Sequence, residues 1–145
     1  PSIYRRILDE GHVIGNHTQD HLNGWKATDK NYIDNIFEAG KYIDSSLFRP
    51  PYGKITRFQV QLLQQARSGG GNPFKIVMWD VLSGDFDTKL SPEKCLQHVL
   101  LKSKAGSIIV FHDSTKAWDR MSYALPRTLE HFSGQGFSFR ALQNL

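Results

Sequence analysis

Hydrophobic and polar positions along the chain predict helices that alternate with short strands. Apolar residues recur at helical spacing within residues 2–10, 28–46, 56–67 and 120–133, and again from residue 91 onward. Alternating or continuous apolar runs predict strands at residues 12–15, 47–49, 75–81, 107–111 and 137–142. Strict alternation of this kind is typical of parallel strands joined by crossover helices, which form either a (β/α) barrel or an open doubly wound sheet.

Turn and capping residues support several of the predicted boundaries. Gly11 follows the first predicted helix, and Pro92 takes the first position of the fourth. The run Gly69-Gly70-Gly71-Asn72-Pro73 ends the third. No Gly-x-Gly-x-x-Gly segment follows a predicted strand, which argues against a nucleotide-binding fold. We therefore predict a single α/β domain over residues 1–145.

Composition and charge exclude several classes of protein. The 145 residues are 39% hydrophobic and 22% charged, which is ordinary for a globular domain, and the net charge is +4. Lysines and arginines are scattered, with only Arg5 and Arg6 adjacent, so no basic stripe predicts nucleic-acid binding. No apolar run approaches the roughly 18 residues of a membrane span. The lone cysteine, Cys95, cannot form an intrachain disulfide and is expected to be an inert buried thiol.

Polar residues with catalytic potential gather where the predicted strands end. In barrel enzymes the catalytic groups lie at the carboxyl ends of the strands. The residues at these positions are His17, His21, Arg49, Asp80, Asp85, His112 and Asp113. They predict a site at one end of the sheet.

Two of these residues, His17 and His21, are four positions apart. On a helical turn they would share one face and could chelate a divalent metal such as zinc. Asn16 or Thr18 could cap that turn. Asp20 would face elsewhere and is a poor third ligand. The spacing alone is weak, because six histidines can produce such a pair by chance.

The other candidate groups follow later strands. Arg49, at the head of Arg49-Pro50-Pro51-Tyr52-Gly53, suits bidentate binding of a carboxylate, although an ordinary strand-exit turn would look the same. A carboxylate at Asp80 or Asp85 facing His112 would fix the tautomer of the imidazole and favour its charged form, as a general acid requires. A buried structural His–Asp pair is the alternative.

Taken together, these segments resemble the NodB-like polysaccharide deacetylases, carbohydrate esterase family four. His17-Thr18-Gln19-Asp20-His21 resembles the second motif of that family, and Arg49-Pro50-Pro51-Tyr52-Gly53 matches the third. Asp85-Phe86 is similar to the fourth, usually Asp-Trp, and Val110-Phe111-His112 to the fifth, usually Leu-x-His. The order and spacing agree from residue 2 to residue 142. The resemblance implies a NodB-type distorted (β/α) barrel that removes N-acetyl groups from an amino-sugar polymer such as peptidoglycan or chitin.

The resemblance also implies roles for single residues. His17 and His21 would be metal ligands, with zinc the expected ion and cobalt or another divalent ion also suited. His112 would be the general acid tuned by Asp85, Arg49 would orient the catalytic base, and the Tyr52 amide would donate to the oxyanion. The expected substrate pocket consists of Pro51, Trp79, Phe86 and Val110.

One motif of the family, Thr-Phe-Asp-Asp-Gly-Pro, has no match, since Asp-Asp occurs nowhere in the chain. Its two carboxylates are the base and the third metal ligand, so we expect an N-terminally truncated, incomplete barrel and an inactive fragment. A second chain or a retained N-terminal fragment would cover the open barrel edge. No signal peptide is visible, although the resemblance favours the cell envelope or secretion. A non-catalytic carbohydrate-binding remnant and an amidohydrolase of small amides remain alternatives.

Overall fold

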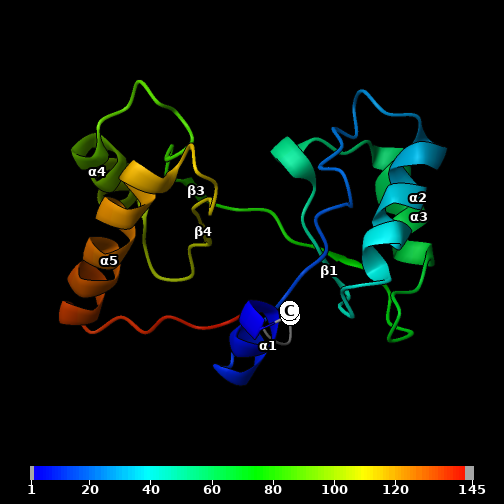
Figure 1. Ribbon diagram of the computed structural model, residues 1–145, viewed down its shortest axis with the longest axis horizontal. Helices are drawn as coiled ribbons and strands as arrows, with labels where there is room; N and C mark the ends of the chain where they lie inside the picture. Colours follow the sequence, from blue (N-terminus) through cyan, green and yellow to red (C-terminus); the bar gives the residue numbers. More distant parts are fainter. Residues whose placement is uncertain (1, 143–145) are drawn as a thin grey trace. The chain divides into compact units, whose positions relative to one another are not determined.

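The computed structural model describes residues 2–142 as an α/β chain (Figure 1). The elements in order are α1 (Ser2–Asp9), α2 (Asp29–Gly40), β1 (Leu47–Phe48), the 3-10 turn η1 (Pro51–Gly53), α3 (Arg57–Gln65), β2 (Lys75–Ile76), β3 (Val81–Leu82), α4 (Pro92–Lys102), β4 (Ile109–Val110) and α5 (Trp118–Gly134). Contacts divide the chain into a first unit, up to Met78 with Ala141 and Leu142, and a second unit, Trp79–Arg140. Within residues 2–142, no helix has the length and apolar character needed to cross a bilayer.

The first unit is built on a parallel pair of strands. β1 pairs with β2 at Leu47–Lys75 and Phe48–Ile76, and Asn16 adds a parallel bridge to Phe48. Helices α2 and α3 lie side by side (Figure 1). The buried core of this unit is Tyr32, Ile36, Phe48, Leu63 and Phe74. Because both helices and β1 contribute to this core, it holds the carboxyl end of β1 in place.

The second unit has the same plan. β3 pairs in parallel with β4 at Val81–Ile109 and Leu82–Val110, and α4 packs against α5 (Figure 1). Ser91 caps α4, its side chain accepting the backbone N–H of Lys94, as its position before Pro92 predicts. Cys95 and Val99 on α4 are buried. The helix α5 continues through Pro126 and buries its own apolar face on α4.

Two of the differences between the predicted and the observed elements have a clear physical cause. The predicted helix at 28–46 ends at Gly40, where glycine has a low helix propensity and Lys41 donates its N–H to the carbonyls of Glu38 and Ala39. The predicted strand at 75–81 is two strands. The Val77 N–H donates to Phe48, whereas those of Asp80 and Val81 donate to Ile108, so the chain changes partner in between.

Two predicted strands are absent from the described residues. Residues 12–15 form no ladder, and only the next residue, Asn16, pairs with β1. Residues 137–142 alternate in polarity but pair with no strand among residues 2–142, and Phe139 is 48% exposed. An alternating pattern forms a strand only where a neighbouring strand satisfies its backbone. The α/β class is confirmed, whereas the single domain and the incomplete barrel remain predictions.

Candidate functional site

The sequence-predicted site residues fall into two groups, one in each unit. His17, His21, Arg49, Pro51 and Tyr52 belong to the first unit, and Trp79, Asp85, Phe86, Val110 and His112 belong to the second. Within each group the structure brings most of the predicted side chains into contact.

His17 and His21 are neighbours, but not on a helix as predicted. Their ring centroids are 4.9 Å apart, and His21 contacts Tyr52 at 4.7 Å. Thr18 and His21 have φ angles of 64° and 54°. Since few residues other than glycine adopt such angles, this segment is a strained loop held by contacts elsewhere in the fold.

Two buried asparagines hold this loop, and the sequence pattern did not identify Asn35 as one of them. Asn35 Oδ1 accepts the N–H groups of Gln19 and Asp20, each at 2.9 Å, and its Nδ2 donates to the Asp20 carboxylate at 2.6 Å. Asn16 Nδ2 donates to the Ile36 carbonyl at 2.8 Å, and its Oδ1 accepts the Thr18 N–H. Asn16 therefore forms a side-chain turn within a loop, and not the helix cap that was expected.

His17 has a defined ring orientation. Its Nδ1 lies 2.6 Å from the Arg49 carbonyl oxygen, which can only accept, so Nδ1 carries the proton and Nε2 the lone pair of the neutral ring. Metal-binding histidines commonly have this arrangement, because the backbone bond orients the ring. No group of three His, Cys, Asp or Glu side chains within residues 2–142 is arranged to hold a metal ion.

Arg49 and Tyr52 follow β1 through a tight turn. The Arg49 guanidinium donates from Nε to the Val77 carbonyl at 3.1 Å and from Nη2 to the Met78 carbonyl at 3.4 Å. Partial burial lowers the pKa of Arg49 from its ordinary value. Tyr52 has a φ of 58° after the buried Pro51, and its side chain is exposed. Their expected roles, orienting a base and donating to an oxyanion, remain predictions.

Asp85 and His112 form the predicted pair, and Asp80 does not take part. The fully buried Asp85 carboxylate accepts His112 Nδ1 at 2.7 Å and the His112 backbone N–H at 2.6 Å. Asp80 instead accepts the Ile108 N–H, a structural contact. Burial raises the pKa of Asp85, but the bonds from the His112 ring and backbone outweigh it, so the net pKa is lowered. Asp85 is therefore a carboxylate at neutral pH.

Gly84 and Arg120 place this pair, and neither was identified from the sequence. Gly84 turns the chain after β3 with a φ of 81°. The buried Arg120 of α5 donates from Nε to the Asp85 carbonyl at 2.7 Å and also bonds the Lys116 carbonyl. The turn at Gly84 and the bond from Arg120 to the Asp85 carbonyl fix the backbone at Asp85.

One of the expected pocket residues, Phe86, contacts the pair. The Phe86 ring contacts His112 edge to face at 5.4 Å and is 39% exposed. Val110 is buried at the end of β4, and Trp79 is half-buried. Cys95 on α4 is also buried in this unit. Burial and, to a smaller extent, the Asp85 charge raise the pKa of its thiol. The thiol is thus protonated at neutral pH, as expected of an inert cysteine.

The lowered pKa of Asp85 predicts acid sensitivity. A carboxyl group with a lower pKa in the folded than in the unfolded state stabilises the fold above its unfolded value, about 3.9. This contribution should be lost as the pH falls below about 4. We expect the free energy of unfolding, measured by urea titration, to decline less steeply below pH 4 in Asp85→Asn than in the wild type. Equal slopes would contradict this assignment.

Comparison with known proteins agrees with this geometry. The family model described as "Polysaccharide deacetylase" matches residues 1–70. A peptidoglycan-N-acetylglucosamine deacetylase of Bacillus cereus is 28% identical, aligned over 100% of this chain and 68% of its own length. Chitin deacetylase 2 of Saccharomyces cerevisiae is 30% identical over 80% of this chain, which covers 39% of that protein.

Solved structures extend the similarity to the fold. The crystal structure of a peptidoglycan N-acetylglucosamine deacetylase in complex with a benzamide ligand superposes with a TM-score of 0.85 and 30% identity. The match covers 98% of this chain and 66% of that one. The chain thus spans about two thirds of the length of that B. cereus enzyme and of that crystallised deacetylase, and 39% of the yeast enzyme. From these motifs, this geometry and these relatives, the chain belongs to the NodB-like polysaccharide deacetylases, carbohydrate esterase family four.

Proposed function

We propose that this chain supplies the general acid and two metal ligands of an N-deacetylase that acts on an acetylated amino-sugar polymer. The observation that carries the proposal is the Asp85–His112 pair, in which a buried carboxylate binds both the ring and the backbone of one histidine. The B. cereus and yeast relatives are named as deacetylases of peptidoglycan and chitin, which supports the substrate class.

The geometry of the pair suits proton delivery. With Nδ1 bound to Asp85, the His112 ring presents Nε2 as its other proton-carrying atom, and 39% of the side chain is exposed. The ionised Asp85 stabilises the charged ring electrostatically and holds its orientation. In N-acetyl hydrolysis His112 would donate this proton to the departing amine of the sugar.

The residues in the first unit fit part of a metal site. His17 and His21 would hold a divalent ion, zinc being the best match to imidazole ligands, and a third ligand would come from outside residues 2–142. When bound, such an ion polarises a carbonyl oxygen and lowers the pKa of water. The chain itself contributes the orientation of His17 through the Arg49 carbonyl.

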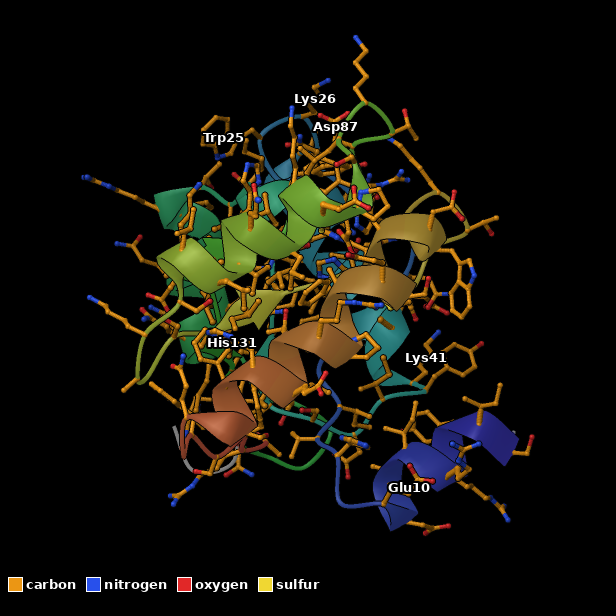
Figure 2. All side chains as sticks on the ribbon, turned by 90° about the vertical axis from the view of Figure 1, so that its left-hand side faces the viewer. Glu10, Trp25, Lys26, Lys41, Asp87 and His131 are labelled. Atoms are coloured by element: carbon orange, nitrogen blue, oxygen red, sulfur yellow. The ribbon has the colours of Figure 1, made fainter. Side chains whose placement is uncertain are left out.

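A partial site predicts weak metal binding. We expect isothermal titration of the 145-residue chain with zinc to show weak binding that His17→Ala abolishes and His131→Ala leaves unchanged. His131 is an exposed histidine of α5 (labelled in Figure 2) and serves as the matched control. Tight binding that persists in His17→Ala would contradict the proposed ligand.

The lack of an Asp-Asp segment in the sequence also favours a second candidate, a carbohydrate-binding chain without turnover. A deacetylase and a binding remnant differ in one measurement, acetate release. An amidohydrolase of small amides would instead release acid from small N-acetyl compounds and spare the sugar polymers.

A chimera tests the proposed activity directly. This chain would replace the matching segment of the B. cereus relative, so that the rest of that enzyme is present. We expect the chimera to release acetate from N-acetylglucosamine oligomers or peptidoglycan, whereas the chain alone does not. A folded chimera that binds zinc but releases no acetate would overturn the proposed activity and favour the binding remnant.

A further inference from the structure

The exposed Trp25 lies on one of two adjacent segments, which also carry His21 and Tyr52. Residues 21–25 run beside residues 52–55. The His21 and Tyr52 rings are in contact, the Gly24 N–H donates to the Lys54 carbonyl at 3.1 Å, and Trp25 Nε1 donates to the Ile55 carbonyl at 3.1 Å. Four residues of chain span at most about 14 Å, so Trp25 lies within that reach of His21.

The backbone beside Trp25 is tightly fixed. A Cβ on Gly24 would lie 2.5 Å from the Lys54 carbonyl oxygen and 2.7 Å from Gln59 Oε1, so only glycine fits. The buried Gln59 donates to the Gly24 carbonyl at 2.8 Å and to the Asp29 carboxylate at 2.9 Å. The close approach therefore holds residues 23–25 against the start of α3.

The Trp25 side chain is held in place but remains mostly exposed. It is 63% exposed, and Figure 2 shows Trp25 and Lys26 extending outward from the ribbon. Its indole N–H is occupied by the Ile55 carbonyl and one face of the ring by Lys54, which leaves the other face as the available surface. A preorganised exposed ring loses little conformational entropy on binding. Such a flat apolar surface suits the C–H face of a pyranose ring.

The Lys54 ammonium group lies over the Trp25 ring. Lys54 Nζ lies 3.8 Å from the centroid of the Trp25 ring, within cation–π range. Among residues 2–142, no carboxylate forms a salt bridge with Lys54. Lys26 beside it is exposed. The pair thus combines a stacking surface with a positive charge that forms no salt bridge within residues 2–142.

We propose that Trp25 and Lys54 form a subsite for a sugar next to the reacting residue of the glycan, and that Lys54 meets a carboxylate on that sugar. This inference rests on the proposed function and narrows the substrate class. It favours an acidic amino-sugar polymer, with muramic acid-like carboxylates, over a neutral chitin-like one.

Binding by the unmodified 145-residue chain tests the subsite. The probes are peptidoglycan glycan strands freed of stem peptides, whose muramic acid carboxylates are exposed, and chitin oligomers of equal length. We expect Trp25→Ala to weaken binding of both by about 3–10-fold, the scale of one aromatic contact. Lys54→Met should weaken binding of the acidic strands alone, by about 2–5-fold, and reduce its salt dependence.

Matched variants separate the subsite from general effects. Trp118 on α5 is 58% exposed, so Trp118→Ala controls for the loss of an exposed indole and should leave binding unchanged. Trp25→Tyr keeps a flat ring and should retain most of the affinity. Absence of binding by the wild type, equal losses in Trp25→Ala and Trp118→Ala, or equal losses on both glycans in Lys54→Met would overturn the proposal.

The chimera distinguishes this inference from the proposed function. If the subsite is correct, Trp25→Ala should raise KM by the same 3–10-fold with little change in kcat. Binding that depends on Trp25 in a chimera without acetate release would reject deacetylation and retain the subsite. Acetate release with KM unchanged in Trp25→Ala would reject the subsite and retain deacetylation.

Discussion

Replacing His112 with alanine should lower the turnover of the chimera by about 10²–10⁴-fold, the usual contribution of a general acid. The ring would no longer deliver a proton to the departing amine, and Asp85 would lose the bond to Nδ1 while keeping the one from the backbone N–H. Because the site is otherwise intact, KM should change little. Initial rates of acetate release at saturating substrate measure the effect.

The control for this variant is the exposed imidazole of His131. His131, in the last turn of α5, forms a hydrogen bond with the Gln135 side chain and contacts the Phe132 ring. His131→Ala should retain wild-type turnover. If His112→Ala also retained it, with the fold intact by circular dichroism, His112 could not be the acid.

Replacing Asp85 with asparagine should affect both stability and rate. The carboxylate accepts two N–H groups from His112, and an amide can accept only one of them while presenting its own NH₂ to the other. Leaving one buried donor unpaired costs about 1–3 kcal/mol of unfolding free energy. The ring also loses its anionic partner, so turnover should fall by roughly 10²–10⁴-fold.

Asp113 offers the matched control, since it is the next residue after His112 and is exposed. Asp113→Asn should change unfolding by no more than about 0.5 kcal/mol and leave turnover intact. Urea titration and acetate release are measured on the same preparations. An Asp85→Asn chimera with wild-type turnover would show that the pair is structural only, the alternative that the sequence left open.

Local patterns identified most of the helices. The Ser91-Pro92 start of α4 and the apolar spacing of α3 and α5 depend on residues three or four positions apart, so they can be read from the chain. The strand boundaries that were wrong lie where tertiary contacts decide. The strands have two residues each in the structure, and their pairing joins segments nearly 30 positions apart. Periodicity alone contains no information about such partners.

In the candidate site, too, some features follow from the sequence and others only from the tertiary structure. The sequence predicted which residues would carry the chemistry, through four ordered motifs that include His17, His21, Asp85 and His112. Only the tertiary structure decided that the two histidines meet on a loop, because Asn35 and other distant groups satisfy the loop backbone that a helix would have satisfied itself. The tertiary structure likewise placed Asp85, and not Asp80, against His112. The turn at Gly84 and the bond from Arg120 of α5 to the Asp85 carbonyl position the Asp85 carboxylate. Asp80 instead accepts the Ile108 N–H.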